Sequence, residues 1–568
     1  MIPALLHPVL TAVAATVDPA AEVEPVAPTG NPAHGDYQWN FAFRMAKSLR
    51  MNPRALAEKL RPLIEEAAHP AIRKVEVAGP GFINLTLDDA WIARTLAAQV
   101  DSPAMGVAQV GAGRTAVVDF SSPNVAKRMH IGHMRSTHIG HALVSMHRAE
   151  GWTVVGDNHI GDWGTQFGKL IVAYRNWLDP EAFEADAIGE LERIYVLFGD
   201  KAKEDPTLAD QARAEIAKLQ KGDAENIALW KRFIAISMAE FEGVYARLGV
   251  RFDEVLGESA YTGMTDAIVH DLLATNVAEP SEGAIIVRFE NDVMIARKRD
   301  GADNYATSDL ACVRYREDRW QPDRMIYVTD MRQQRHFQQF FEVSRRLGLT
   351  DADLVHAWFG MLVLPDGAIS STRGGNTIRL VDLLDEAVRR ARAVVDAKSP
   401  QLSDEARAAI AEAVGVGAVR YADLSQHPQT NITFDWDRML SLEGNTAPYL
   451  LYSYARAASV LAKARSAEEG GQLPDLAAIA LGHPLERDLA LALARYPELV
   501  AAATRGYRPN QLAEHLYEIA GRFNRFFHDC PVLKGGEARA SRLALVEATR
   551  RVLRHGMELL GLTVLERM

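Results

Sequence analysis

The sequence predicts a multidomain protein of the α/β plus all-α class, with a doubly wound parallel-sheet domain, a helical bundle after it and a small α/β domain before it. Three observations predict this class. The chain has 568 residues, which is too long for one hydrophobic core. Short β-branched runs alternate with helical patterns between residues 111 and 380. Beyond residue 380, almost every segment has helical spacing.

The first part, residues 1–110, mixes two kinds of pattern. A helix-like stretch covers residues 38–67, and a strand-like run, FINLTL, covers residues 82–87. The chain starts with an apolar segment that has no Lys or Arg before Arg44, whereas a secretory signal needs a basic beginning. We therefore expect the apolar start to be part of the fold.

Strand and helix patterns alternate in the second part, residues 111–380. The buried-type strand TAVVDF (115–120) leads through an irregular loop to a helix over 134–150 and then to the strand in WTVVGD (152–157). A charged helical stretch over about 175–255 is typical of an insertion. Three later strand patterns, GAIIVRF (283–289), DRMIYVTD (323–330) and HAWFGMLVL (356–364), are expected to complete the sheet. Ligands of such sheets lie outside the carboxyl ends of the strands.

The remainder is predicted to be helical, with breaks at GGQLPDL (470–476) and KGGEARA (534–540). We expect the division 1–110, 111–380, 381–435 and 436–568.

Composition limits the class of protein. Hydrophobic residues make up 48% and charged residues 24%, as in soluble globular proteins, and no window approaches the roughly 18 apolar residues of a membrane span. The only two cysteines, Cys312 and Cys530, suit a reducing cytoplasm and exclude a disulfide scaffold or a cysteine-based zinc site. We therefore expect a cytoplasmic protein that does not bind a membrane.

Net charge is −11 but unevenly spread. From Arg438 onward there are 17 Lys and Arg and 14 Asp and Glu, so this end is mildly basic, whereas the rest of the chain is acidic. That balance permits a polyanionic partner at this end, and ordinary surface variation explains it equally well.

The segment MHIGHMRSTHIGHAL (129–143) contains the tetrapeptide HIGH twice. The first copy, His130 to His133, follows a buried strand and an irregular loop and leads into a helix N-terminus, where backbone N–H groups favour phosphate. Gly132 permits close approach. Two imidazoles there can donate hydrogen bonds to an α-phosphate as it becomes pentacoordinate. We therefore interpret the first copy as a nucleotide site.

The second copy, His138 to His141, has no strand before it and lies within helical apolar spacing. We expect Gly140 to allow close helix packing and the two histidines to be surface or groove residues. The alternative is a metal site formed by the four histidines, since zinc accepts nitrogen ligands. Loop and helix positions converge poorly and no cysteine or carboxylate cluster supports such a site, so no structural metal is expected.

A set of ordered motifs resembles arginyl-tRNA synthetases, a family of class I aminoacyl-tRNA synthetases. The motifs are SSPNVAKRMHIGHMRST, NHIGDWGTQFG, YATSDLA, VTDMRQQRHFQQFF, STRGGNTIRLVDLLDEA and ADLSQHPQTNITFDWDRMLSLEGNTAPYLLYSYAR. GPGFINLTL near the front and LGLTVLERM at the end extend the resemblance over nearly the whole chain. It implies a Rossmann-type catalytic domain, a DALR-type helical anticodon-binding domain and an additional N-terminal domain that recognises tRNA.

The resemblance also implies an activity. ATP, with Mg²⁺, activates L-arginine to arginyl-adenylate, which is then passed to the terminal adenosine of tRNA(Arg). A planar guanidinium needs carboxylates positioned for it. Matching motifs imply arginine contacts at Asp119, Ser122, Asn124, His133, Tyr305, Asp309 and Gln333. Without the resemblance, Asp119 would be interpreted as a strand end and Asp309 as a helix cap.

ATP contacts are implied at His130, Gly132, His133, His159, Gly161, Ser371 and Thr372. His159 and Gly161 stand after the second strand with Asp162 and Gln166, where a satisfied loop histidine is the plain alternative. The family's usual KMSKS loop is replaced by AISSTRGGN, which lacks its lysine. The resemblance then implies that Lys127 supplies the missing charge, with Arg373 as a second candidate, so the catalytic set is Lys127, His130, Gly132, His133 and Arg373.

The tRNA contacts implied by the resemblance are Phe82, Asn84, Tyr449, Tyr452 and Arg456. Phe82 and Asn84 match positions that stack on and hydrogen-bond an unpaired base, although a core phenylalanine and a turn asparagine explain them equally well. Tyr454 is a further stacking candidate. The basic run Arg542, Arg550, Arg551 and Arg554 suits phosphate or a solvated helix face.

The partners expected are tRNA(Arg) and L-arginine, and the chain is expected to be monomeric. Three other functions stay open from the sequence: another class I synthetase, a nucleotidylyltransferase with an HxGH motif that needs no RNA, and a synthetase-like RNA-binding protein without catalysis. The large, basic helical end argues against the second, and only the missing lysine supports the third.

Overall fold

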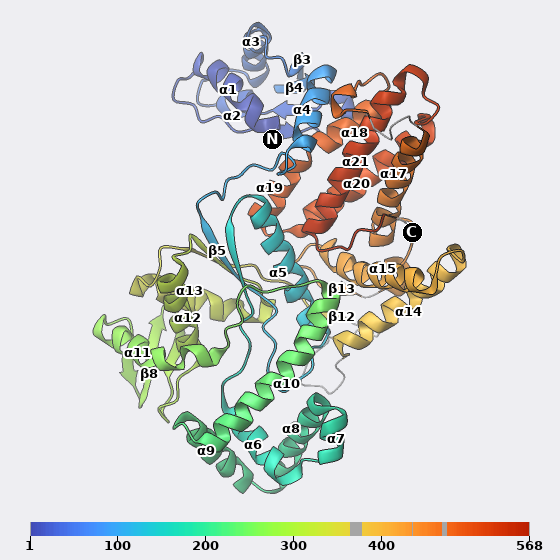
Figure 1. Cartoon of the computed structure of the whole chain (residues 1–568). Coiled ribbons are helices and arrows are strands. Elements are labelled where there is room, and N and C mark those ends of the chain that lie inside the picture. The colour runs from blue at the N-terminus through green and yellow to red at the C-terminus, as the bar shows by residue number, and fades with distance from the viewer. Residues whose placement is uncertain (1, 364–377, 434, 468–473, 567–568) are drawn as a thin grey trace.

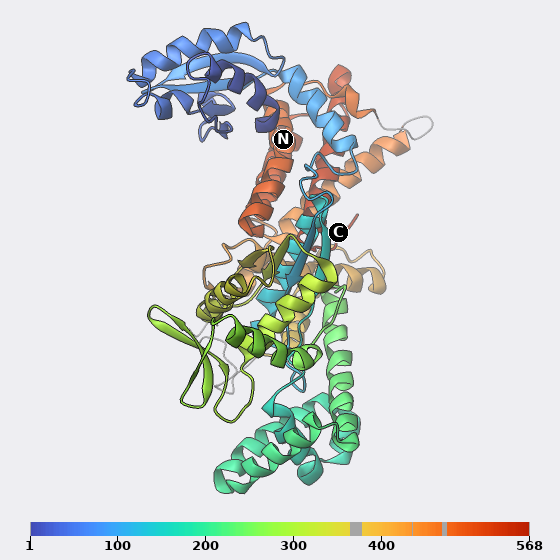
Figure 2. The same cartoon turned by 90° about the vertical axis from the view of Figure 1, so that its left-hand side faces the viewer.

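A computed structural model describes residues 2–363, 378–433, 435–467 and 474–566. The molecule is elongated (Figures 1 and 2). The N-terminal part lies at one end beside the C-terminal helices, the parallel sheet lies in the middle, and the insertion helices form the other end (Figure 2).

The N-terminal part is a four-stranded antiparallel sheet, ordered β1-β2-β4-β3, with helices packed on it. Its elements are α1 (Ile2–Ala15), β1 (Ala27–Pro28), β2 (Tyr37–Trp39), α2 (Phe41–Met45), α3 (Pro53–Glu66), β3 (Ile72–Ala78), β4 (Phe82–Leu87) and α4 (Asp89–Asp101). The apolar start forms α1, whose Ile2, Leu6 and Leu10 are buried, so its prediction as part of the fold is confirmed. The prediction of helix from residue 38 was wrong, because Gln38 and Trp39 pair with β4 as a strand.

The central sheet has the order β11-β10-β5-β6, and all its strands are parallel. Its strands are β5 (Thr115–Asp119), β6 (Thr153–Asp157), β10 (Arg324–Tyr327) and β11 (Asp353–His356). The associated helices are α5 (Ile131–Ala149), α11 (Thr265–Ala274), α12 (Tyr305–Trp320) and α13 (Gln334–Leu347). The doubly wound prediction is confirmed, and the carboxyl ends of β5, β6 and β10 meet at one edge.

Two strand predictions for this region were wrong in their placement. GAIIVRF forms β8 (Ala284–Phe289) of a separate antiparallel sheet with β7 (Glu279–Ser281) and β9 (Asp292–Arg297). Local hydrophobic pattern cannot assign a strand to one sheet or another. The other run, HAWFGMLVL, is divided: His356 ends β11, whereas β12 (Leu362–Val363) pairs with β13 (Ile432–Thr433), far along the chain.

The insertion consists of helices, as its charged periodic pattern predicts. They are α6 (Thr165–Trp177), α7 (Pro180–Ala185), α8 (Ala187–Glu204), α9 (Thr207–Gln220) and α10 (Ala224–Leu248). The long helix α10 ends at Gly249, whose φ of 62° suits a residue without a side chain, and it connects the insertion back to the sheet (Figure 1).

The C-terminal half is helical, as predicted, apart from β13. Its helices are α14 (Leu380–Lys398), α15 (Asp404–Leu424), α16 (Trp436–Met439), α17 (Ala447–Ala467), α18 (Pro484–Ala494), α19 (Tyr496–Gly506), α20 (Pro509–Asp529) and α21 (Arg539–Leu559). Helix α5 of the sheet domain contacts α14, α15, α19, α20 and α21, so the HIGH helix joins the two halves of the molecule.

Candidate functional site

The loop from β5 to α5 is held in a strained conformation. Ser121, Ser122 and Ala126 have φ angles of 74°, 50° and 60°, in a region that costs a non-glycine residue about 1–3 kcal/mol. Buried hydrogen bonds hold the loop: the Ser121 hydroxyl lies 2.8 Å from the hydroxyls of both Thr137 and Tyr245. Strain that the surroundings enforce in this way is typical of a functional loop.

The first HIGH copy begins α5 and caps it. His130 is the N-cap, and its Nδ1 accepts a hydrogen bond from the backbone N–H of Gly132 at 3.0 Å. In return, Nδ1 of His133 accepts from the backbone N–H of His130 at 3.1 Å. A Cβ at position 132 would lie 2.7 Å from the His130 ring, so this arrangement requires glycine. In both rings Nδ1 is an acceptor, which leaves Nε2 to carry the proton of a neutral imidazole.

Both imidazoles are neutral at physiological pH. Burial lowers the pKa of His130 to about 4, with a smaller effect from Lys127, and lowers the pKa of His133 to about 3, with a smaller effect from His130. The ring centroids are 4.0 Å apart. Two adjacent Nε2–H donors at a helix N-terminus are suited to bind a phosphate oxygen, and to stabilise charge that develops on it.

A cavity lies in front of these histidines. Its lining includes six of the residues predicted for the site: Ser122, Asn124, His130, Gly132, His133 and Gln333. Thr329, Asp330, Phe359 and Gly360 from the ends of β10 and β11 close it. The cavity therefore opens at the carboxyl edge of the sheet, where ligands of such folds bind.

Asp119 ends β5 at the same edge, where its two carboxylate oxygens have different partners. Oδ1 accepts at 3.1 Å from the hydroxyl of Ser122, which lines the cavity, whereas Asp119 itself is not among the lining residues. Oδ2 accepts from Nη2 of Arg316, a fully buried residue of α12, at 2.7 Å, and the same Nη2 donates to Asp157 at 2.7 Å. The sequence analysis did not identify Arg316 or Asp157 as site residues. Asp157 stands at the end of a predicted strand, and that position is a signal that could have identified it.

Asp309 and Tyr305 lie on α12, and neither is among the residues that line the cavity in front of the HIGH histidines. The carboxylate of Asp309 lies 2.5 Å from Nε2 of His336, and the ring of His336 packs on Tyr305 with centroids 4.5 Å apart. Tyr305 is 62% exposed, so its side chain is accessible to a ligand. His336 is a third residue that the sequence analysis did not identify.

The NHIGDWGTQ segment packs against the strained loop. Gly161 forms a bridge with Asn124, and a Cβ at position 161 would lie 2.3 Å from Oδ1 of Asn124. His159 stacks on Tyr261, and its buried Nδ1 has no hydrogen-bond partner among the described residues. Asp162 accepts from the backbone and hydroxyl of Ser259, which gives it a structural role. Gln166 likewise bonds within its own segment, to the Trp163 carbonyl.

Lys127 does not line the cavity in front of the histidines. Its Nζ lies 5.1 Å above the ring of Tyr195, a residue of the insertion helix α8, in a smaller cavity that Gln166 also lines. Its backbone neighbour Arg128 pairs with Asp186 of the same insertion at 2.5 Å. The loop before HIGH is therefore attached to the insertion. Ser371, Thr372 and Arg373 lie outside the described residues.

The prediction that the histidines of the second HIGH copy are surface or groove residues was wrong for His138. His138 is buried, and its Nδ1 lies 3.3 Å from Asp423 of α15. His141 is half-buried, with its Nδ1 3.5 Å from Arg420. The prediction for Gly140 is confirmed, because a Cβ there would lie 2.2 Å from Cβ of Phe120. Helical spacing alone does not show that a second domain covers this face.

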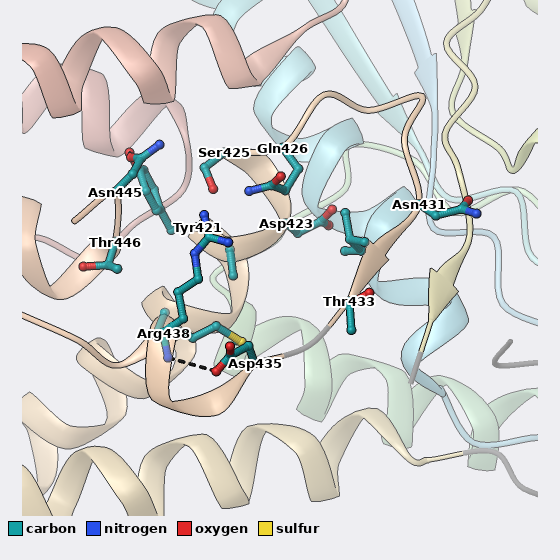
Figure 3. A pocket seen from close by; sticks show the side chains of 14 residues that line it. Tyr421, Asp423, Ser425, Gln426, Asn431, Thr433, Asp435, Arg438, Asn445 and Thr446 are labelled. Atoms are coloured by element: carbon teal, nitrogen blue, oxygen red, sulfur yellow. Dashed lines mark hydrogen bonds between the residues drawn. The ribbon is translucent and has the colours of Figure 1, made fainter. Parts of the chain in front are cut away.

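Asp423 also belongs to a second polar cavity, between the end of α15 and the segment before α17 (Figure 3). Within it, the Tyr421 hydroxyl donates to Asn445 at 2.6 Å, and Arg438 extends across the cavity from α16. Arg135 of α5 donates to Asp423 at 2.9 Å and to the Gly360 carbonyl of the first cavity at 2.7 Å. Buried polar contacts thus connect the two cavities.

Within the described ranges, no three His, Cys, Asp or Glu side chains gather as they would around a metal ion. None of the helices in these ranges is long and apolar enough to cross a bilayer.

Three family models match the chain in order. Residues 5–87 match the arginyl-tRNA synthetase N-terminal domain, residues 97–436 the catalytic domain of class I (R) tRNA synthetases, and residues 450–568 the DALR anticodon-binding domain. An arginine–tRNA ligase of Fusobacterium nucleatum is 46% identical over 557 residues, which cover 97% of this chain and 96% of the relative. The chain belongs to the arginyl-tRNA synthetase family.

Further relatives agree with the family. An arginine–tRNA ligase of Chloroflexus aggregans is 44% identical over 93% of this chain and 92% of its own. The arginyl-tRNA synthetase structure of Plasmodium falciparum superposes with a TM-score of 0.86 at 25% identity, covering 100% of this chain and 99% of that one. That of Thermus thermophilus has a TM-score of 0.84 at 24% identity over the full length of both chains, which supports the fold.

The residues predicted for tRNA contacts in the N-terminal domain differ in accessibility. Phe82 is half-buried and stacks on Phe43, with centroids 5.9 Å apart. Asn84 is 4% exposed, and its Oδ1 accepts from Gln38 at 3.1 Å. Phe82 and Phe43 form a partly accessible aromatic pair, whereas Asn84 would need to move before it could contact a base.

In the C-terminal helices, Tyr452 is 43% exposed beside Arg456, whose guanidinium lies 4.7 Å from its ring. Tyr449 is half-buried, and its hydroxyl accepts from Asn524 at 3.0 Å. Tyr454 was a wrong stacking candidate, because it is buried and its hydroxyl donates to Glu566. The basic run Arg542, Arg550, Arg551 and Arg554 is ion-paired with Glu486, Glu547 and Glu558.

Proposed function

We propose that this synthetase is an arginine–tRNA ligase. It activates L-arginine with ATP to arginyl-adenylate and transfers the arginyl group to the 3′-terminal adenosine of tRNA(Arg). The observation that carries the proposal is the pair of neutral HIGH imidazoles on a cavity that is also lined by Ser122, the hydrogen-bond partner of Asp119. The full-length relationship to arginine–tRNA ligases supports it.

Each group has a role that follows from its chemistry. Asp119 and Asp309 bind the substrate guanidinium, while Ser122, Asn124, Tyr305 and Gln333 position the rest of the amino acid. The Nε2–H groups of His130 and His133 donate to the α-phosphate, and they stabilise the charge that develops as the arginine carboxylate attacks it. Lys127 or Arg373 offsets the charge of the departing pyrophosphate.

Mg²⁺ is proposed to enter with ATP and to supply charge neutralisation on the phosphates. The side chains that line the cavity fit a metal ion that is held mainly by ATP. Among the described residues that line the cavity, the one carboxylate is Asp330, which Arg332 already binds at 2.6 Å, so phosphate oxygens rather than a protein cage would hold the ion.

We further propose that the family's division of labour applies. Residues 1–110 contact tRNA, residues 111–380 catalyse with an insertion over about 175–255, residues 381–435 link the parts, and residues 436–568 bind the anticodon. Phe82, Asn84, Tyr449, Tyr452 and Arg456 are the proposed tRNA contacts, and His159 and Gly161 are proposed to contact ATP with Ser371 and Thr372. The protein is proposed to be a cytoplasmic monomer.

The test is to charge total tRNA with each of the twenty amino acids in turn, in the presence of ATP and Mg²⁺. We expect arginine alone to be attached. Attachment of another amino acid would assign a different specificity. Arginine-dependent pyrophosphate exchange that needs no RNA at all would favour a nucleotidylyltransferase type of enzyme.

A further inference from the structure

Three parallel strands bring three polar side chains into one row. In the register of the sheet, Asp119 of β5 is paired with Asp157 of β6 on one side and with Tyr327 of β10 on the other. Neighbouring residues in a parallel sheet point to the same face. Arg316 reaches this row from α12, with its guanidinium 5.3 Å from the Tyr327 ring.

Arg316 connects the two carboxylates through one nitrogen. Its Nη2 donates to Oδ2 of Asp119 and to Oδ2 of Asp157, each at 2.7 Å. Arg316 and Asp157 are fully buried, whereas the Asp119 side chain is 10% exposed. Of the three, Asp119 alone is linked to the site, because its Oδ1 accepts from the hydroxyl of Ser122, which lines the cavity.

The arrangement places the positive charge of Arg316 between the carboxylates of Asp119 and Asp157. Without a cation between them, two neighbouring buried carboxylates would share a proton, because two adjacent negative charges are unfavourable where water does not reach them. Burial raises the pKa of Asp157, and Arg316 opposes that rise. The other titratable groups that face the trio are His159 after β6, Tyr261, Cys312 of α12 and Tyr327.

We propose that Arg316 is a positioning residue for the amino-acid substrate. By bridging Asp119 and Asp157 through their Oδ2 atoms, it holds the two carboxylates side by side and leaves Oδ1 of Asp119 on the side of Ser122, where that oxygen receives the guanidinium of arginine. The proposal rests on the proposed function, because it names the residue that prepares one of its substrate contacts.

A purely structural ion pair would have different consequences. Its loss would lower stability and reduce every kinetic parameter through the fraction of folded protein. A positioning role is confined to one substrate: the KM for arginine changes, while the KM for ATP does not. The role is also sensitive to pH, since the two carboxylates left behind share a proton at low pH and are ionised at higher pH.

The test measures arginine and ATP KM values in tRNA charging for wild type and Arg316→Met at pH 6.5 and pH 8.0. We expect the variant to raise the arginine KM at least tenfold at pH 6.5 and by clearly less at pH 8.0. The ATP KM should stay within about twofold, and wild type should show little change with pH. The double variant Arg316→Met with Asp157→Asn removes the second carboxylate, so it should abolish the pH dependence and recover part of the arginine affinity.

Two further variants keep the test decisive. Arg420→Met removes another fully buried arginine, one that bonds to the carbonyls of Leu248 and Gly561 away from the site, and it should leave the arginine KM unchanged at both pH values. If Arg316→Met does not fold, Arg316→Lys replaces it, with an expected rise in arginine KM of about threefold or more and an unchanged ATP KM.

Parallel changes in both KM values, or no change in either, would overturn the positioning role. Failure of the proposed function is distinguishable, because the wild-type protein would then not charge tRNA with arginine at all.

Discussion

The backbone N–H of His130 donates to Nδ1 of His133 at 3.1 Å, and this one bond decides which nitrogen of His133 can carry a proton. Since Nδ1 accepts, the neutral ring is protonated at Nε2 and is ready to donate to a phosphate. The same contact caps α5, so the fold of the helix and the chemistry of the site depend on the same side chain.

Removal of that donor should slow activation. We expect His133→Ala to lower the rate of adenylate formation by two to three orders of magnitude, the usual effect of deleting one preorganised donor. Single-turnover activation with saturating arginine and tRNA measures it. His133→Asn is the control, because its Oδ1 can replace Nδ1 as the cap acceptor but its amide does not reach the Nε2 position. A fully active His133→Asn would show that only the cap matters.

The low pKa of His133 predicts an acid-dependent loss of stability. Its pKa is about 3 in the folded protein against about 6.5 when unfolded, so below pH 6.5 the unfolded state takes up a proton that the folded state does not. The stability that depends on the neutral ring is complete above pH 6.5 and falls as the pH decreases toward 3. Between pH 6.5 and pH 5, wild type should lose about 2 kcal/mol relative to His133→Asn, measured by urea unfolding. Equal losses in both proteins would contradict this.

The second HIGH copy should matter for stability rather than chemistry. His138→Ala leaves the buried Asp423 carboxylate without one partner, which should destabilise the protein by about 1–3 kcal/mol. Below the unfolding temperature, activation should remain within a few-fold of wild type. Thermal unfolding and activation assays on the same sample separate the two effects. Lost activation at unchanged stability, together with stoichiometric zinc in the wild-type protein, would instead support a four-histidine metal site.

The carboxylates should control affinity for arginine. We expect Asp119→Asn and Asp309→Asn each to raise the arginine KM by about thirtyfold or more, since removing one partner of a buried charge pair costs roughly 2–5 kcal/mol. The ATP KM should change far less. Asp323→Asn is a matched control, because that carboxylate pairs with Arg114 at the opposite edge of the sheet. An unchanged arginine KM in both site variants would place the guanidinium elsewhere.

Lys127 is expected to act in the transition state, although its ammonium faces Tyr195 in this structure. It must turn away from that ring to reach a phosphate beside the HIGH histidines. We expect Lys127→Ala to lower the activation rate about a hundredfold with little effect on arginine KM. Arg373→Ala is the comparison: if it is the more damaging change in rapid-quench assays, the two roles are exchanged.

Some features were predictable from sequence and others were not, for a physical reason. The strand before HIGH, the HIGH helix and the helical insertion follow from local periodicity, and they have the predicted structure. Arg316 and His138 could not be recognised as buried, because a charged or polar residue in a helix is normally solvated and only its partners from distant segments make burial possible. The separate sheet of β8 was missed because pairing partners are set by topology.

The contacts of Arg135 limit how the chain can be divided. This buried arginine of the HIGH helix bonds to Asp423 and to the Thr430 carbonyl, and β12 pairs with β13 beyond residue 430. A fragment that stopped at residue 380 would keep Arg135 and His138 but lose the carboxylate that both contact. It would therefore carry unsatisfied polar groups in its interior, on the same helix as the histidines that are proposed to bind phosphate. An excised catalytic unit should extend at least through Thr433. The part of the chain that folds around the site therefore extends beyond the last strand of the central sheet.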